Sequence, residues 1–253
     1  MLESYIHARL HEKNILLMTH IVLGYPSLKE SFRIIEAMVE AGVDLVELQI
    51  PFSEPIADGP VIAYANQKAL EAGVTVQGCL TAAEEIARTF TIPFLIMSYY
   101  NPIYTYGVHR FVSALASADM KGAIIADLPP EEGQQYLKAM EQYHLAPILI
   151  FSPTTPLERM NYLAGFGRGF IYCVARKGVT GADTTFSEEG SNYLSRCREA
   201  THLPLAVGFG IKEKADIDFL KGRADIAVIG TQTIRLMEKE GIGAVKDFVR
   251  SLR

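Results

Sequence analysis

Two carboxylic acids lie at a strand-to-loop transition of this 253-residue chain, where they could perform acid–base chemistry. The apolar run Leu45–Ile50 predicts a strand with one acid, Glu47, inside it, and the Pro/Gly-rich loop that follows contains a second acid, Asp58. An acid in a buried strand is costly unless it is paired, protonated or used in catalysis. We interpret Glu47 and Asp58 as a candidate acid–base pair. The structural alternative is that Glu47 belongs to a polar network and that Asp58 caps the next helix.

Three glycine-containing turns indicate a second kind of chemistry, the binding of an anion. They are Gly208–Gly210, Gly230 followed by Thr231, and Gly178–Gly181. Glycine lets backbone N–H groups approach an anion closely, and the Thr231 hydroxyl adds a donor. Together these turns predict a phosphate site, although each of them alone is typical of an ordinary turn.

The polar run from Val174 to Thr185 is long for a connection inside a compact domain. Long connections often close over active sites, so this run is a candidate lid. The alternative is an ordinary surface loop.

The elements that position these residues alternate between short β-branched runs and amphipathic helical patterns. Eight runs predict strands: Ile15–Val22, Leu45–Ile50, Phe94–Met97, Gly122–Ala126, Ala146–Phe151, Gly169–Val174, Leu205–Val207 and Ile226–Ile229. The predicted helices are Leu2–Leu10, Ser27–Glu40, one that begins at Thr81, Gly107–Ala116, Pro130–Tyr143, Leu157–Ala164, Glu188–Glu199, Lys212–Lys221, Thr233–Glu238 and Ile242–Leu252. The alternation indicates parallel strands with helical crossovers. We predict that residues 1–253 form a single (β/α)8 TIM barrel, an α/β fold, with an open doubly wound sheet as the alternative.

Two of the predicted helices are expected in particular places. Thr81-Ala82-Ala83-Glu84 has the spacing of a capping box, so a helix is expected to begin there. The extra N-terminal helix, Leu2–Leu10, precedes the first strand and is expected to close the bottom of the barrel.

Composition excludes several classes of function. The net charge is −5 and no Lys/Arg cluster forms a basic stripe, which argues against nucleic-acid binding. The apolar runs are too short for a membrane span, and the charged N-terminus does not resemble a signal peptide, so we expect a cytoplasmic protein. Three widely spaced cysteines and six histidines show no metal-ligand spacing. We interpret Cys173 as core filler rather than as a nucleophile.

The segment from Glu47 to Pro60, Glu-Leu-Gln-Ile-Pro-Phe-Ser-Glu-Pro-Ile-Ala-Asp-Gly-Pro, closely resembles the signature of the tryptophan synthase α chains. Further matches follow in order along essentially the whole chain: Tyr99–Ile103 with Tyr106-Gly107, Ala126–Glu132, Gly178–Gly181 and Gly208–Ile211. The resemblance implies a single (β/α)8 barrel, in agreement with the independent strand count. It also implies retro-aldol cleavage of indole-3-glycerol phosphate to indole and glyceraldehyde 3-phosphate.

By this resemblance, Glu47 is the general acid/base that protonates indole C3 and takes up the proton of the 3′-hydroxyl, alone or with water. Asp58 is the acid that accepts the indole N–H bond. The division requires a protonatable Glu47 and an ionised Asp58. The implied indole pocket consists of His20, Met97, Tyr99, Ile124, Ala126, Tyr172, Phe209 and Val228. The implied phosphate site consists of Gly181, Gly210, Gly230 and Thr231, and Thr180 is placed on the lid, toward the aspartate.

Four residues depart from the family pattern. Gln49 stands where glycine is usual, Glu54 where aspartate is usual, His20 where an apolar residue is usual and Val22 where threonine is usual. Gln49 brings bulk and polarity beside the catalytic strand. For His20, a satisfied core histidine is the alternative to substrate contact.

The implied partner is the tryptophan synthase β chain, in an αββα assembly through which indole passes. Pyridoxal phosphate would belong to that partner, and this chain is expected to need no cofactor or metal. The segments expected to face the partner are Pro51–Pro60, Asn101–Tyr106 and Pro129–Glu132, although Pro102–Tyr106 also suits a rigid barrel loop.

Three other functions stay open from the sequence. The first is a catalytically impaired chain that acts mainly as an allosteric activator of the β chain. The second is a stand-alone lyase that releases indole, and the third is another phosphosugar barrel enzyme.

Overall fold

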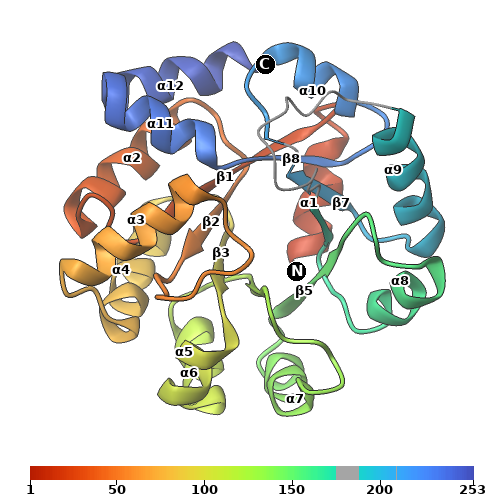
Figure 1. The fold of residues 1–253 in the computed structure, drawn as a ribbon, viewed down its shortest axis with the longest axis horizontal. Coiled ribbons are helices and arrows are strands. Elements are labelled where there is room, and N and C mark those ends of the chain that lie inside the picture. Colours follow the sequence, from red (N-terminus) through yellow and green to blue (C-terminus); the bar gives the residue numbers. More distant parts are fainter. Residues whose placement is uncertain (175–187, 209) are drawn as a thin grey trace.

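The structure, a computed structural model, describes residues 1–174, 188–208 and 210–253. In these ranges, eight parallel strands pair in chain order, and β8 closes on β1 to complete a barrel inside a ring of helices (Figure 1). The strands are β1 Leu16–Val22, β2 Leu45–Gln49, β3 Phe94–Ser98, β4 Gly122–Ile125, β5 Ala146–Phe151, β6 Ile171–Val174, β7 Leu205–Gly208 and β8 Ile226–Ile229. The closed barrel confirms the predicted fold class and contradicts the open sheet.

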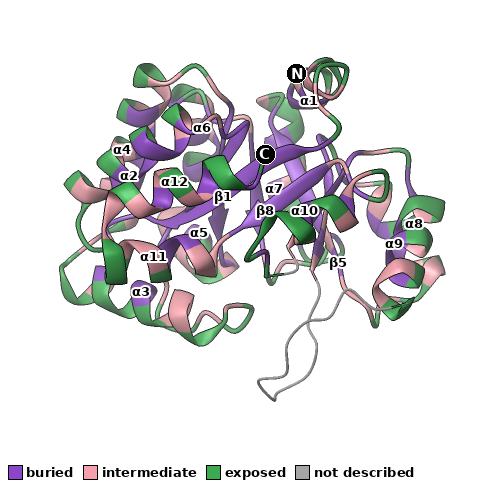
Figure 2. Cartoon of the chain, turned by 90° about the horizontal axis from the view of Figure 1, so that it is seen from above, coloured by how far each residue is buried: buried purple, intermediate pink, exposed green. Residues whose placement is uncertain are grey.

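The helices are α1 Leu2–Leu10, α2 Leu28–Glu40, α3 Pro60–Glu71, α4 Val76–Thr89, α5 Tyr100–Tyr106, α6 Val108–Ser117, α7 Gln134–Gln142, α8 Leu157–Ala164, α9 Glu188–Ala200, α10 Lys214–Leu220, α11 Thr231–Glu240 and α12 Ile242–Ser251. Their outer faces are exposed, whereas the strands they surround are almost entirely buried (Figure 2).

Alternation along each strand divides the apolar residues between two cores. On β1, Leu16 and Met18 belong to the cluster inside the barrel, whereas Leu17 and Ile21 belong to the larger cluster between strands and helices. Successive side chains of a strand point to opposite faces. His20 follows the parity of Leu16 and Met18, so the strand itself directs it into the barrel.

Helix α1 packs at the N-terminal end of the barrel, as predicted. Leu2 and Ile6 are buried in the interior cluster, and the Tyr5 hydroxyl donates to the carbonyl oxygen of Asp44 at 3.1 Å. In Figure 1 this helix lies across the centre of the ring. The functional end of the barrel is therefore the opposite one.

Asp44, just before β2, forms the main polar cluster of the N-terminal end. It is 1% exposed and forms ion pairs with Arg9 and Arg253, at 3.3 Å each, and with Lys13. The backbone N–H of Leu17 donates to its Oδ2 at 3.0 Å. Both oxygens of this buried carboxylate therefore have partners, which compensates its desolvation.

Several predicted boundaries were wrong. The helix expected to begin at Thr81 is α4, which begins at Val76: the Thr75 side chain caps it by accepting from the N–H of Gly78 at 3.1 Å. Thr81 lies inside that helix, and its hydroxyl donates to the Gln77 carbonyl oxygen. A hydroxyl residue can serve either role, so the capping-box spacing alone did not locate the start.

Two helices were not predicted from the sequence. The segment Asn101–Tyr106, predicted to face the partner, lies in helix α5, which contradicts the rigid-loop alternative for Pro102–Tyr106, and α3 follows the loop that contains Asp58. Pro60 occupies the first turn of α3, where its missing N–H costs nothing. Proline is common both at helix starts and in loops, so these Pro-containing segments did not by themselves indicate a helix.

Candidate active site

The register of β1 against β2 brings Glu47 beside His20. The two residues are direct partners in the parallel ladder, and His20 Nδ1 lies 2.7 Å from Glu47 Oε1. Both side chains are almost fully buried, at 5% and 3% exposure. Glu47 is thus buried and paired, as predicted for an acid in a buried strand, and its partner is the histidine that departs from the family pattern. The contact also fits the structural alternative, in which Glu47 belongs to a polar network.

A second contact joins Asp58 to β2. The Gln49 side-chain amide donates from Nε2 to Asp58 Oδ2 at 2.7 Å. Asp58 does not cap the following helix, because the N-cap of α3 is Gly59, without a side-chain cap. The structural alternative for Asp58 is therefore contradicted.

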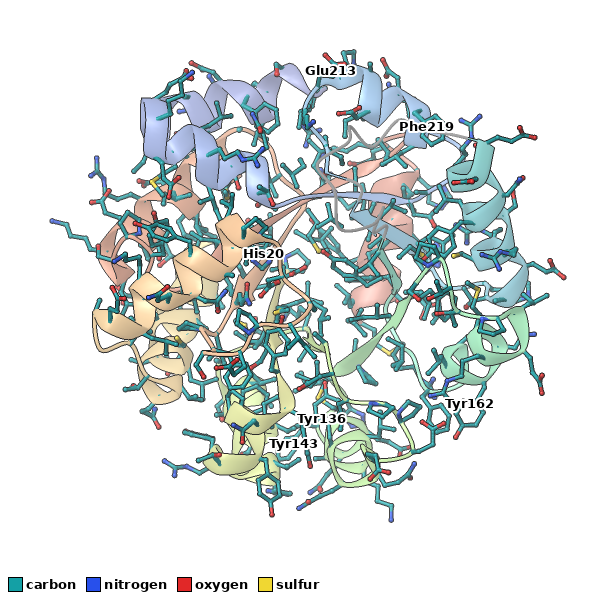
Figure 3. All side chains as sticks on the ribbon, in the orientation of Figure 1. His20, Tyr136, Tyr143, Tyr162, Glu213 and Phe219 are labelled. Carbon is teal, nitrogen blue, oxygen red and sulfur yellow. The ribbon has the colours of Figure 1, made fainter. Side chains whose placement is uncertain are left out.

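The two carboxylates reach the same cavity, of about 590 Å³, at the C-terminal end of the barrel. Its lining includes eleven of the residues predicted for the site: His20, Glu47, Asp58, Met97, Ile124, Ala126, Tyr172, Gly210, Val228, Gly230 and Thr231. Figure 3 shows His20 in the interior of the ring, whereas Tyr162 and Phe219 lie at the periphery. The C-terminal face is where barrel enzymes carry their active sites.

Four predicted site residues are not among the lining. Thr180, Gly181 and Phe209 lie outside the described residues, as does the predicted lid Gly178–Thr185. Tyr99 is fully buried below the loop: its ring lies 5.3 Å from that of Phe52, and its hydroxyl accepts from the N–H of Ala57 at 3.0 Å. Tyr99 therefore supports the loop that carries Asp58 instead of lining the cavity.

Some lining residues were missed. Val174 has the same parity on β6 as the predicted Tyr172, and Ile150 has the parity of Ile148, which belongs to the interior cluster, so alternation along the two strands would have found them. Lys212, which follows β7, and Arg235, on α11, also line the cavity. Both follow the glycine turns closely in the sequence, and the tertiary structure decides that their side chains face the cavity.

Burial and neighbouring charges change the acid–base properties of the site. Burial alone would lower the pKa of His20, but the adjacent Glu47 carboxylate, with smaller contributions from Asp58 and Gln49, gives a net rise. Burial raises the pKa of Asp58, against the opposing effects of His20 and the Gln49 hydrogen bond. Burial and the charges of Glu47 and Asp58 raise the pKa of Tyr172 well above its usual value, so its hydroxyl stays protonated.

The two sides of the cavity differ in character. The described residues contain no cluster of three or more His, Cys, Asp or Glu side chains that could hold a metal ion. One side of the cavity is apolar, through Met97, Ile124, Ile150 and Val228, and the other has glycine turns and cations. This arrangement fits a ligand with an aromatic group and an anionic group.

Comparison with known proteins identifies the family. The model of the family "Tryptophan synthase alpha chain" matches residues 6–251. The chain belongs to this family. It is 61% identical over 252 residues to the tryptophan synthase alpha chain of Desulforapulum autotrophicum and 55% identical over 253 residues to that of Syntrophotalea carbinolica, each covering all of both chains.

Solved structures agree with this assignment. A tryptophan synthase structure from Mycobacterium tuberculosis superposes with a TM-score of 0.92 at 31% identity, covering 99% of this chain and 96% of the other. A tryptophan synthase alpha chain from Legionella pneumophila gives 0.89 at 28% identity, covering 99% and 95%.

The chain is thus a tryptophan synthase alpha-type lyase, which cleaves indole-3-glycerol phosphate in tryptophan biosynthesis. The family also implies a β-chain partner. The comparisons give no support to the impaired chain, the stand-alone lyase or another phosphosugar enzyme. None of the helices in the described ranges has the length and apolar character needed to cross a membrane.

Proposed function

We propose that Glu47 and Asp58 perform the cleavage of indole-3-glycerol phosphate in the cavity at the C-terminal end of the barrel. The observation that carries the proposal is that both carboxylates reach this one cavity, from a strand and from the loop after it. Glu47 protonates indole C3 and takes up the proton of the 3′-hydroxyl, alone or with water, as the C–C bond breaks. Asp58 accepts the indole N–H bond and stabilises the cationic intermediate.

The two sides of the cavity suggest how the substrate lies. The indole ring occupies the apolar side, against Met97, Ile124 and Val228. The phosphate lies at Gly210, Gly230 and Thr231, where α11 begins and its N-terminus favours an anion. Gly210 has a φ of +73°, a conformation that a side chain would strain, so this turn depends on glycine.

Positive charge supports the same orientation of the substrate. Lys212 and Arg235 line the cavity beside the glycine turns and add the charge that a phosphate requires. Tyr172 completes the indole pocket, while Phe209, Gly181 and Thr180 remain predicted contacts of the ring, the phosphate and the lid.

The proposal extends to the assembly. The β-chain partner binds the face that carries the Asp58 loop and α5, in an αββα complex, and pyridoxal phosphate belongs to that partner. Ile56 and Tyr104, 72% and 67% exposed, offer large apolar side chains on these segments. Residues 1–253 act as one domain of a cytoplasmic enzyme.

The test is indole release from indole-3-glycerol phosphate by the purified chain, with and without a cognate β chain. We expect turnover that the β chain stimulates. Glu47→Gln should keep the affinity for a substrate analogue and lose a factor of about 10²–10⁴ in rate, the range for removal of a general acid/base. Activity of the variant within about tenfold of the wild type would remove Glu47 from this role.

A matched control uses an exposed acid of the same type. Glu36→Gln, on the outer face of α2, should leave the rate unchanged. A loss of rate in this control would show that the assay responds to charge in general.

A further inference from the structure

Two residues that depart from the family pattern, His20 and Gln49, are neighbours in space and lie between the two carboxylates of the cavity. We propose that they are positioning residues, which join Glu47 and Asp58 into one polar chain, Glu47–His20–Gln49–Asp58, that supplies a proton to Glu47 and orients Asp58. This inference rests on the proposed function, because it assigns chemistry to both carboxylates.

At both ends of this polar chain, the contacts between the side chains are direct. His20 Nδ1 lies 2.7 Å from Glu47 Oε1, and Gln49 Nε2 donates to Asp58 Oδ2 at 2.7 Å. Glu47 and Gln49 are two residues apart on β2, so both side chains point into the barrel, and Gln49 is fully buried. Strand β2 thus supplies both an acid, Glu47, which contacts His20, and an amide, Gln49, which contacts Asp58.

The centre of the chain consists of unpaired polar atoms. His20 Nε2 and Gln49 Oε1 are buried and have no hydrogen-bond partner in the described part of the chain, and the same holds for Glu47 Oε2. The first two are a potential donor and an acceptor on adjacent groups, and Gln49 contributes to the raised pKa of His20. An unpaired buried polar atom is costly, so a protonated His20 that donates to Gln49 would remove two such costs at once.

In this arrangement the transferable proton of the pair lies on His20 Nδ1, against Glu47 Oε1. It passes to Glu47 across the 2.7 Å contact as Glu47 protonates indole C3, which leaves His20 neutral, with its proton on Nε2, and Glu47 ionised. When Glu47 takes up the proton of the substrate 3′-hydroxyl, the pair regains the proton that it lost. Glu47 Oε2 is the oxygen that remains for the substrate.

The proton affinity of the pair depends on every charged or titratable group that faces the cavity. These groups are Glu47 on β2, Asp58 in the loop after it, Tyr172 on β6, Lys212 after β7 and Arg235 on α11. Val228 on β8 and Gly230 just after it also face the cavity and carry no charge. The carboxylates favour the proton on His20, whereas the cations oppose it.

The experiment is the pH dependence of kcat/KM for the wild type and for His20→Asn, which keeps a polar group but cannot be protonated. We expect the alkaline limb of the kcat/KM profile of the variant to move to lower pH by about one unit or more, because the asparagine side chain cannot supply a proton to Glu47. A variant profile of unchanged shape, scaled evenly at all pH values, would reduce His20 to a structural role and overturn the proposal.

Gln49→Leu tests the other end of the chain with a side chain of similar size. We expect kcat to fall about tenfold, on the scale of one hydrogen bond, with KM changed much less. A change confined to KM would contradict a role in orienting Asp58.

Thr19→Val is the matched control. Thr19 is the neighbour of His20 on β1 and is fully buried, and its hydroxyl oxygen also has no partner among the described residues, but it points out of the barrel. This variant should leave the pH profile unchanged. A shift as large as that of His20→Asn would show that any buried polar change on β1 moves the profile, which would overturn the proposal.

A measurement on the wild-type protein keeps the proposal testable if a variant fails to fold. In ¹⁵N-histidine NMR spectra, His20 should carry protons on both ring nitrogens at neutral pH. A neutral ring at pH 6 would overturn the proposal. Glu47→Gln distinguishes failure of the proposed function from failure of the polar chain. If this variant retains activity, the proposed function is wrong. If it is inactive while His20→Asn has a normal pH profile, only the polar chain is wrong.

Discussion

The two ends of β2 hold two buried carboxylates in opposite ways. Asp44 precedes the strand at the N-terminal end of the barrel, where two arginines, a lysine and a backbone N–H occupy both of its oxygens. Glu47, inside the strand, contacts His20 through one oxygen, and its other oxygen has no hydrogen-bond partner in the described part of the chain. Both are at most 2% exposed.

The difference lies in the partners rather than in the burial. Arginine and lysine keep their charge at all physiological pH values, so the partners of Asp44 do not change in this range. Histidine can gain or lose a proton in this range, so the pair of His20 and Glu47 can change its protonation state. A fully paired buried acid stabilises the fold, whereas a partly paired acid beside a histidine is suited to proton transfer.

The largest effect is expected from Asp44→Asn. It leaves three permanent cations together at the bottom of the barrel, and we expect the free energy of unfolding to fall by about 2–3 kcal/mol. This is below the usual loss for a broken buried pair, because the cations are 21–34% exposed and can be hydrated. Urea denaturation measures the loss, and kcat of the folded protein should stay at the wild-type value.

Glu47→Gln should change stability much less than Asp44→Asn does. His20 can become neutral once the carboxylate is gone, so no uncompensated charge is left, and we expect a change within about 1 kcal/mol in either direction. The same urea denaturation measures it. A loss equal to that of Asp44→Asn would mean that the two acids do not differ in the way proposed.

The dependence of stability on pH should further distinguish the His20–Glu47 pair from the cluster around Asp44. The pKa of His20 in the folded state is raised above its ordinary value of 6.5. The contribution of protonated His20 to the free energy of unfolding is therefore fully present below about pH 6.5 and is lost as the pH rises through the folded-state pKa. The difference in unfolding free energy between wild type and His20→Phe should shrink from pH 6 to pH 9, which thermal and urea unfolding would measure. A difference that grows with pH would contradict a raised pKa.

The smallest effect is expected from Arg253→Met, which removes one of the three cations around Asp44. The side chain is 33% exposed and two cations remain, so we expect a loss of about 0.2–1 kcal/mol, typical of an exposed pair. Its aliphatic part is retained by Met. A loss above that range in urea denaturation would show that the three cations do not share the charge of Asp44.

The barrel was predictable because strand and helix patterns are local. Eight apolar runs separated by amphipathic helices at this length leave few alternatives to a closed parallel barrel, and the structure has strands at all eight positions. Boundaries were less predictable. Gly169, expected inside the sixth strand, has a φ of +80°, so β6 begins only at Ile171, and the helix expected from Pro130 begins at Gln134, after a turn at Pro129–Gly133.

The two acids of the candidate site were also found from the sequence, because each is anomalous in its own segment. An acid inside an apolar strand and an acid in the loop beyond it need no knowledge of other segments. The roles of His20 and Gln49 were not predictable in this way. His20 is 27 residues from Glu47, and nothing in the composition of β1 sets which residue of β2 it will face.

The sequence by itself therefore determined the barrel, its order of elements and the presence of Glu47 and Asp58 at its functional end. Only the tertiary structure decided that His20 pairs with Glu47, that Gln49 contacts Asp58, and that the side chains of Arg235 and Lys212 line the cavity. The physical reason is that alternation along a strand is a local property, whereas the register between strands follows from closing the whole barrel.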